Sequence, residues 1–507
     1  MRTTLSVLVL AAILLSPARA IAACADLARL NLPNTTVTRA EVVAPGAFTT
    51  AGPAASQTLY ARLPEFCRVG ATLRPSADSE IRIEVWLPTQ WNGRFQAVGN
   101  GAWAGVIPYA PMAGAVVEGF VAAGTDTGHV GNTAAFAVGH PEKVIDLGYR
   151  AVHEMTVQAK ALINSFYGRA PQFSIWNGCS QGGRQGITAA VRYPTDFDGV
   201  IAGAPAVNWM HLHAGRMAAN RAANRTPVAT IPADKYPLIH SAALAACDAN
   251  DGVKDGVIED PLSCRFDPRV LQCSGDGAGC LTAAQVESAR ALYAPVLDPK
   301  TGEQILPGLV PGSELAWATA ASPRPVATAL DAFKYIVFQD ANWDPVSFNA
   351  ATDIERTLRA DSNDVLNSAS TDLKAFFDRG GKLLMYHGWA DTQVTPLNSI
   401  DYFQKVASRI GAPIVGTSIQ LYMVPGMNHC NGGPGTDQFN KITALEQWMA
   451  TGTAPETIPA SRVTNGVVDR TRPLCTFGRV AKWNGTGSSD DAANFSCVAP
   501  ESTPLRR

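Results

Sequence analysis

A serine set among glycines is the clearest chemical signal in this chain. The stretch Gly178-Cys179-Ser180-Gln181-Gly182 matches the pattern G-x-S-x-G and lies between a predicted strand at 172–178 and a predicted helix at 182–194. A sharp strand-to-helix turn exposes the serine hydroxyl, and glycines allow neighbouring backbone to pack closely. The spacing therefore predicts that Ser180 is a catalytic nucleophile.

A serine nucleophile needs a general base and a third group that orients the base. Where such a turn is used, the chain order is serine, acid, histidine, and the acid and the histidine follow later strands. Asp391 ends the apolar run 380–391, and His429 lies at the end of the run 419–430. We therefore predict a triad of Ser180, Asp391 and His429.

Seven other histidines compete with His429 for the role of base. His387 precedes the acid and lies within its strand, so we interpret it as a packed, hydrogen-bonded histidine near the site. The other six lack a comparable setting and are interpreted as structural or surface residues: His129, His140, His153, His211, His213 and His240.

Ester or amide cleavage also needs two backbone N–H groups that stabilise the developing oxyanion. One is expected from Gln181, which follows the nucleophile, and the other from a loop after an early strand. The glycine-rich stretch 99–105 is the best candidate for that loop, with Gly101 as the donor. The alternative is that 99–105 is an ordinary glycine-rich turn.

A cysteine stands beside each of two predicted catalytic residues: Cys179 precedes Ser180, and Cys430 follows His429. If the serine and the histidine are within hydrogen-bond reach, their neighbours approach the ~5.5 Å Cα separation of a disulfide. We therefore predict a Cys179–Cys430 bridge. Two alternatives stay open: either cysteine is a buried small apolar residue, or Cys179 is itself the nucleophile, which the oxidising conditions outside the cytoplasm disfavour.

An acidic run at 247–264 contains Asp248, Asp251 and Asp255 with glycines between them. Closely spaced carboxylates and backbone carbonyls suit a hard cation, and calcium fits better than magnesium, which retains several waters. The spacing differs from that of an EF-hand. We predict a structural calcium ion here, and the alternative is a solvated acidic turn closed by Cys247 and Cys264.

The amino terminus predicts export. Residues 1–20 combine one arginine, a short apolar stretch and a small-residue end, as in a signal peptide cleaved after Ala20 or shortly after, at Ala23. Ten cysteines suggest five disulfides in an exported chain. The sequence at 21–24 also resembles a lipoprotein box, but a lipid on Cys24 would leave nine cysteines. We expect a secreted or periplasmic protein without a membrane span, since no later stretch has ~18 consecutive apolar residues.

Composition and element order indicate the fold class. The net charge of −2 argues against nucleic acid or an anionic membrane as the main partner. Strand-like runs at 81–88, 94–101, 119–128 and 198–205 alternate with helical patterns such as 144–167, which predicts a largely parallel sheet covered on both faces. Regular alternation stops near residue 207 and resumes near 373. The expected divisions are a signal peptide at 1–20, a first core segment at 21–206, a lid insertion at 207–372 and a second core segment at 373–507.

Several of these stretches together resemble the tannase and feruloyl esterase family, which includes the mono(2-hydroxyethyl) terephthalate hydrolases. They are GCSQGGRQG, RYPTDFDGVIAGAPA, CDANDGVKDGVI, FQDANWD, GGKLLMYHGWAD and MNHC. The resemblance implies an α/β-hydrolase fold with a large inserted lid and the same triad. It also implies a lid calcium held by Asp248, Asp251 and Asp255 with the carbonyls of Val253 and Val257. The implied disulfides are Cys24–Cys67, Cys179–Cys430, Cys247–Cys264, Cys273–Cys280 and Cys475–Cys497.

The expected function is hydrolysis of small-molecule esters of aromatic acids, such as hydroxycinnamic or gallic acid, through an acyl-enzyme and without an organic cofactor. A terephthalate half-ester is the alternative substrate, although no lid residue matches the carboxylate-binding arginine of those enzymes. The lid aromatics Trp209, Phe333, Phe338 and Trp343 either stack on an aryl acid or, as we favour, pack in the core. The rivals are a peptidase with the same triad and a non-catalytic binding protein. The sequence does not fix the oligomeric state.

Overall fold

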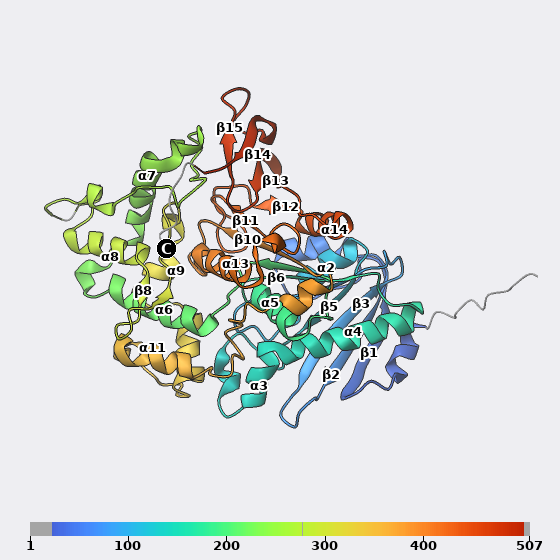
Figure 1. The fold of residues 1–507 in the computed structure, drawn as a ribbon. Coiled ribbons are helices and arrows are strands. Elements are labelled where there is room, and N and C mark those ends of the chain that lie inside the picture. The colour runs from blue at the N-terminus through green and yellow to red at the C-terminus, as the bar shows by residue number, and fades with distance from the viewer. Residues whose placement is uncertain (1–22, 276, 501–507) are drawn as a thin grey trace, which may run out of the picture.

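Nine strands form the central sheet of the computed structural model, which describes residues 23–275 and 277–500 (Figure 1). They are β1 (Thr35–Val43), β2 (Phe66–Leu73), β3 (Ile81–Pro88), β4 (Phe95–Val98), β5 (Val121–Thr125), β6 (Ser174–Cys179), β7 (Gly199–Gly203), β10 (Lys382–Gly388) and β11 (Ile419–Val424). Their order across the sheet is β1-β2-β3-β5-β4-β6-β7-β10-β11. Neighbours are antiparallel from β1 to β5 and parallel from β5 to β11. The predicted, mostly parallel sheet is confirmed.

Helices cover both faces of this sheet. One face carries α1 (Ala54–Tyr60), α2 (Tyr109–Val117) and α14 (Lys441–Thr451), and the other carries α4 (Ala151–Tyr167), α5 (Gln181–Arg192) and α13 (Pro396–Ile410). Side chains of a strand alternate between the two cores. In β10, Leu383 and Met385 pack toward α4, α5 and α13, whereas Leu384 and Tyr386 pack toward α2 and α14. Because both faces are buried, the strands read as continuous apolar runs.

The predicted helix at 144–167 is part of a longer helical segment. It begins with α3 (Pro141–Ile145), continues through a π-helical turn at Asp146–Arg150 and joins α4. Gly168 ends the segment in the left-handed conformation at φ 70°, which a glycine adopts without the steric cost of a Cβ.

Between β7 and β10 the chain leaves the sheet and forms a mainly helical insertion. Its helices are α6 (Trp209–Ala223), α7 (Tyr236–Cys247), α8 (Ala283–Tyr293), α9 (Ala318–Ala321), α10 (Ala327–Asp331) and α11 (Ala350–Arg359), with a hairpin of β8 (Val296–Leu297) and β9 (Gln304–Leu306). These green and yellow elements lie to the left of the sheet in Figure 1. The next helix, α12 (Lys374–Asp378), packs in the core of the sheet. Much of the insertion has apolar clusters of its own. The domain boundaries at 206/207 and 372/373 stay a prediction.

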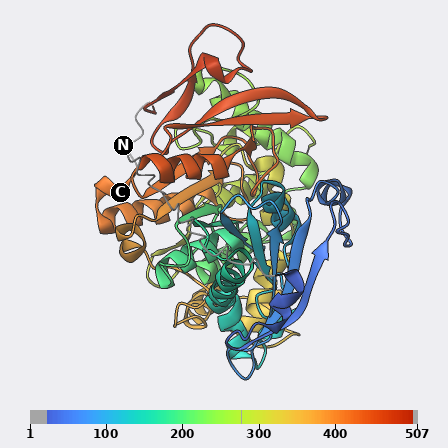
Figure 2. The ribbon, with the colours of Figure 1, turned by 90° about the vertical axis from the view of Figure 1, so that its right-hand side faces the viewer.

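The last strands lie outside the central sheet. They are β12 (Gln438–Phe439), β13 (Thr457–Thr464) and β14 (Val467–Cys475), which pair with one another, and β15 (Val480–Trp483) with β16 (Phe495–Val498). Both views show these red hairpins at the top of the molecule, beyond β10 and β11 (Figures 1 and 2). They reach the acidic loop of the insertion, as described below.

The predicted signal peptide at 1–20 lies outside the described residues. Ala23 and Cys24 are described, and Cys24 is bonded to Cys67, so its sulfur is not available for a lipid. Within 23–275 and 277–500, no helix combines the length and apolar character that a membrane crossing requires.

Candidate active site

Ser180 lies at the sharp turn that joins β6 to α5. Its backbone is at φ 63° and ψ −123°, a conformation that costs a non-glycine residue on the order of 1–3 kcal/mol. The Ser180 N–H donates to the carbonyl of Gly203 at 2.8 Å, which fixes the turn to the end of β7. A Cβ on Gly178 would lie 2.4 Å from the Gly182 carbonyl oxygen, so this turn requires glycine there. The turn has the strained backbone that the motif predicts for a nucleophile elbow.

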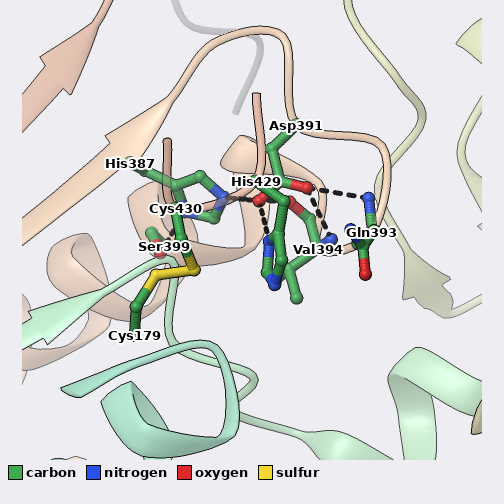
Figure 3. Close-up of a disulfide and its surroundings, with 8 residues drawn as sticks. All are labelled: Cys179, His387, Asp391, Gln393, Val394, Ser399, His429 and Cys430. Atoms are coloured by element: carbon green, nitrogen blue, oxygen red, sulfur yellow. Dashed lines mark hydrogen bonds and ion pairs between the residues drawn. A yellow bond between two sulfur atoms is a disulfide. The ribbon is translucent and has the colours of Figure 1, made fainter. Parts of the chain in front are cut away.

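Asp391 follows β10 and is completely buried. Its Oδ1 accepts the backbone N–H groups of Gln393 at 2.7 Å and Val394 at 3.0 Å. Its Oδ2 accepts a hydrogen bond from Nδ1 of His429 at 2.6 Å (Figure 3). The Asp391 carboxylate can only accept a hydrogen bond, so neutral His429 carries its hydrogen on Nδ1. Its Nε2 then keeps a free lone pair.

The Asp391 carboxyl is held ionised by its surroundings. Burial alone would raise its pKa, but the charge of His429 and hydrogen bonds from His387 and His429 together hold the pKa well below its usual range. A permanently charged acid can stabilise an imidazolium on His429 when that ring takes up a proton. The pair therefore has the chemistry of a base with its orienting acid.

A disulfide joins the serine turn to the histidine loop. Cys179 and Cys430 are bonded with their Cα atoms 6.0 Å apart, across 251 positions of sequence. Figure 3 shows this bond beside His429 and Asp391. Ser180 and His429 are each one residue from a bridged cysteine, so the bond ties together the loops of the candidate nucleophile and the candidate base. Cys179 has no free thiol, which excludes it as the nucleophile in this state.

The other four disulfides connect the pairs that the family resemblance implies. They are Cys24–Cys67, Cys247–Cys264, Cys273–Cys280 and Cys475–Cys497.

The glycine-rich loop after β4 packs against the serine turn. A Cβ on Gly99 would lie 2.5 Å from the Cα of Gly182, so the two backbones are in direct contact. The Asn100 side chain holds the loop by donating to the carbonyls of Val106 and Thr125, both at 2.9 Å. Gly101 is exposed at the tip of this loop.

Gln181 supplies the first backbone N–H of α5. The first N–H groups of a helix have no acceptor within the helix and carry its positive dipole end. An oxyanion hole needs two such backbone N–H groups, and the assignment of Gln181 and Gly101 to that role stays a prediction.

The insertion contacts the glycine-rich loop through aromatic rings. Trp103 stacks on Trp209 of α6 with ring centroids 4.2 Å apart, and its Nε1 donates to the carbonyl of Thr328 at 3.0 Å. The sequence analysis selected Trp209 but missed Trp103. The position of Trp103, two residues after Gly101 in the predicted oxyanion loop, could have indicated it. The other predicted lid aromatics pack on one another, with Trp343 stacked on Phe333 at 5.2 Å and on Phe338 at 5.0 Å.

Most remaining histidines have partners of their own. His140, His153 and His240 bond to Asp78, Asp196 and Glu314, each at 2.9 Å, and His129 Nε2 bonds to the Trp103 carbonyl at 2.8 Å. His213 is buried among Trp103 and Trp209. His387 lies within β10 and contacts Asp391. His387 is therefore packed and hydrogen-bonded, as predicted.

The acidic loop brings its three aspartates into one buried turn. Asp248 accepts the N–H groups of Asp255 and Gly256, and Asp251 accepts that of Val253. Burial, together with the charges of Asp255 and Asp248, raises the pKa of Asp251 to about 6. Such crowding of carboxylates is the chemistry that a divalent cation relieves.

Two arginines of β14 meet the same loop, and sequence reasoning missed them. Arg472 Nη2 pairs with Asp255 Oδ2 at 2.5 Å, and Arg470 Nη1 lies 3.2 Å from the same oxygen. Across residues 23–275 and 277–500, no group of three or more His, Cys, Asp or Glu side chains is arranged to hold a metal ion. In this structure the positive charges facing Asp255 come from the C-terminal hairpin.

Comparison with known proteins extends these observations over the whole chain. A family model described as tannase and feruloyl esterase matches residues 67–498. An uncharacterised esterase of Xanthomonas campestris pv. campestris is 40% identical over 552 residues, covering 98% of this chain and 95% of that protein. Feruloyl esterase C of Talaromyces stipitatus is 33% identical and covers 94% of each chain. The crystal structure of feruloyl esterase B from Aspergillus oryzae matches with a TM-score of 0.85 at 30% identity, over 93% of this chain and 98% of that chain. With the sheet described above, these matches confirm the predicted α/β-hydrolase fold.

Proposed function

Because the chain belongs to the tannase and feruloyl esterase family, we propose that it is an exported serine esterase that hydrolyses esters of aromatic acids through an acyl-enzyme. Family membership makes it a carboxylic ester hydrolase. The aromatic acyl group is proposed from the names of its relatives, feruloyl esterases B and C. The observation that supports the serine mechanism most is the 2.6 Å bond between His429 and Asp391, clamped to the serine turn by a disulfide.

The proposed reaction uses the three residues in their ordinary roles. Ser180 Oγ attacks the ester carbonyl while His429 Nε2 takes the hydroxyl proton, and Asp391 stabilises the imidazolium. The N–H groups of Gln181 and Gly101 donate to the oxyanion of the tetrahedral intermediate. His429 then gives its proton to the departing alcohol, and the aryl acyl group stays on Ser180. Water, activated by His429, releases the aryl acid.

A substrate panel tests the reaction class. We expect hydrolysis of methyl ferulate, methyl gallate or chlorogenate with kcat/KM on the order of 10⁴ M⁻¹s⁻¹ or above. Product release is measured by chromatography, with mono(2-hydroxyethyl) terephthalate and a feruloyl amide as further arms. A preference for the terephthalate half-ester would replace the proposed substrate class, and cleavage of the amide alone would make the protein a peptidase-like enzyme. Binding without turnover of any compound would indicate a non-catalytic module.

Loss of the Cys179–Cys430 disulfide is expected to lower activity more than it lowers the stability of the fold. We expect Cys179→Ala with Cys430→Ala to lower kcat/KM roughly tenfold to a hundredfold, because an ångström-scale misplacement of serine and base costs about that much. The matched control removes Cys273 and Cys280, a disulfide of the insertion that closes only 7 positions, and should leave kcat unchanged. Rates and melting curves are measured on both proteins. Near-normal turnover in the variant without Cys179 and Cys430 would mean that Cys179 only packs as a small apolar residue.

We also propose that the acidic loop binds a structural calcium ion. Asp248, Asp251 and Asp255 would supply carboxylate oxygens, and Val253 and Val257 would supply carbonyl oxygens, the donor set that calcium prefers. The support is the buried, crowded turn, in which the pKa of Asp251 is raised to about 6 by burial and by the two neighbouring carboxylates. The ion would brace the insertion against the C-terminal hairpin that pairs with Asp255.

Calcium removal is expected to lower the melting temperature. A ligand at a hundred times its Kd stabilises the folded state by about 2.7 kcal/mol, and chelation withdraws that contribution. Melting curves are recorded with chelator, with calcium restored and with magnesium, which should restore less. In Asp251→Asn, chelator should have little further effect. Identical curves with and without calcium in the parent protein would contradict the proposed ion.

Export is proposed on the cysteines as well as on the amino-terminal sequence. All ten cysteines are paired in five disulfides. Structural disulfides form and persist in oxidising compartments, outside the reducing cytosol. Cell fractionation would distinguish a periplasmic protein from a secreted one.

A further inference from the structure

A second histidine contacts the same carboxylate oxygen as the catalytic base. His387 Nε2 lies 3.1 Å from Asp391 Oδ2, the oxygen that accepts the 2.6 Å bond from His429 (Figure 3). The His387 ring is completely buried. It approaches from β10, four residues before the acid. Asp391 Oδ2 is therefore shared between two imidazole rings.

The hydrogen-bond partners of His387 fix its tautomer. Nε2 also lies 2.9 Å from the carbonyl oxygen of Val394, which can only accept. Nε2 must therefore carry a hydrogen, which is shared between that carbonyl and Asp391 Oδ2. Nδ1 lies 2.7 Å from the hydroxyl of Ser399 on α13, which donates to it when the ring is neutral. Each ring nitrogen thus has a partner.

From this geometry we propose that His387 is a positioning residue of the active site, which holds Asp391 in place for His429 by donating from Nε2. Together with the N–H groups of Gln393 and Val394, it completes four donors around one carboxylate. Two bonds fix Oδ1 and two fix Oδ2, so the hydrogen bonds favour one orientation of the carboxylate. The role assumes the serine esterase mechanism proposed above.

The neutral form of His387 matters to this role. A cation at this position would cancel the charge of Asp391, which must stabilise the imidazolium of His429. The Ser399 hydroxyl lies 2.7 Å from Nδ1 and can donate to it when that nitrogen carries no hydrogen. Ser399 has no solvent exposure, so this bond is protected from water.

Among the described residues, the titratable or charged side chains that act on Asp391 include His387, His429 and Arg216. His387 and His429 touch it directly, from β10 and from the loop after β11. Arg216 of α6, in the insertion, adds an attraction at longer range. Substitutions of His387 leave His429 and Arg216 in place. A change in the pH dependence of kcat/KM in such a variant therefore reports on the contact between His387 and Asp391.

The test compares His387→Phe, which removes the donor but keeps a planar ring, with His387→Gln, whose amide can donate at a similar reach. We expect His387→Phe to lower kcat about 10–100-fold, as loss of a partner behind a directly acting residue commonly does, with little change in KM. We expect His387→Gln to recover most of that loss. The acid limb of the kcat/KM profile should move to higher pH in the Phe variant, on the order of half a unit, because Asp391 then shares less of its charge with another donor.

Parent enzyme and Ser180→Ala are measured first on the same aryl ester. If Ser180→Ala keeps full activity, the proposed mechanism fails, and the role of His387 fails with it. If Ser180 is essential, the positioning role is judged alone. A Phe variant with parental kcat and an unmoved acid limb would overturn it. So would equal losses in the Phe and Gln variants without a pH shift, which is the signature of a merely structural residue.

Ser399→Ala decides the matter if His387→Phe does not fold. This variant keeps His387 and removes the hydroxyl that donates to Nδ1. We expect a smaller fall in kcat, roughly threefold to tenfold, in line with the loss of one neutral hydrogen bond, together with a change in the acid limb. Unchanged kcat and an unchanged pH profile in a folded Ser399→Ala protein would overturn the proposal.

Discussion

Ser180→Ala is expected to lower kcat on aryl esters by roughly a millionfold, as loss of the nucleophile does in other triad enzymes. Without the hydroxyl no acyl-enzyme can form, and only binding and the oxyanion donors continue to act. The change removes one oxygen from a partly exposed side chain. Alanine meets the same backbone strain at φ 63° that serine does, so the fold should be retained. Ester hydrolysis by the purified variant is measured at high enzyme concentration.

The control for this variant is structural. Its melting temperature should match that of the parent within about a degree or two, since no buried contact is lost. Aryl esters should still bind, which equilibrium fluorescence or calorimetry can measure. Retention of more than a few per cent of parental kcat would contradict the assignment of Ser180.

Asp391→Asn is expected to lower kcat by about 10⁴-fold. An asparagine can keep the backbone bonds of Gln393 and Val394 only by placing its NH₂ group at the Oδ2 position. That group would then face the N–H groups of His429 and His387, where an acceptor is required. His429 would then carry its hydrogen on Nε2. That is the nitrogen that must accept the proton of Ser180.

Asp401→Asn is the matched control for this change. Asp401 lies on α13 and pairs with Lys405 at 2.8 Å at the surface, so the same substitution there should alter kcat by less than about twofold. Steady-state rates of both variants are compared at several pH values. An Asp391→Asn enzyme within tenfold of the parent would mean that another group orients His429.

The candidate triad could be assembled from the sequence because its residues lie at the ends of recognisable strands. Strands of a parallel sheet bring their carboxyl ends to one edge, so Ser180 after β6 and Asp391 after β10 were expected together. His429, on the loop after β11, follows the same rule. Cys179 and Cys430 added a second, independent link between two of these loops.

Contacts that depend on packing between distant segments could not be predicted in the same way. The stacking of Trp103 on Trp209 joins a core loop to the insertion, and nothing in the spacing of the two residues encodes it. The pairing of Arg472 with Asp255 spans 217 positions and depends on where the C-terminal hairpin lies. The π-helical turn at Asp146–Arg150 carries no signal that distinguishes it from α-helix in a pattern of apolar residues.

The role of His387 could be predicted only in part. His387 precedes Asp391 and lies within the same predicted strand, and the prediction of a packed histidine near the site followed from that. What the sequence lacked was the direction of the ring. The folded structure shows that one ring nitrogen contacts Asp391 and the other contacts Ser399.

The most direct test of the account is to trap the acyl-enzyme. The parent protein is mixed with an activated feruloyl ester, quenched in acid during turnover, reduced and digested with trypsin, and the peptides are analysed by mass spectrometry. The proposed serine mechanism predicts a feruloyl group on the peptide 170–184, with fragmentation assigning it to Ser180 rather than Ser174. Turnover of the ester with no feruloyl group on Ser180, or with the group on another residue, would contradict it.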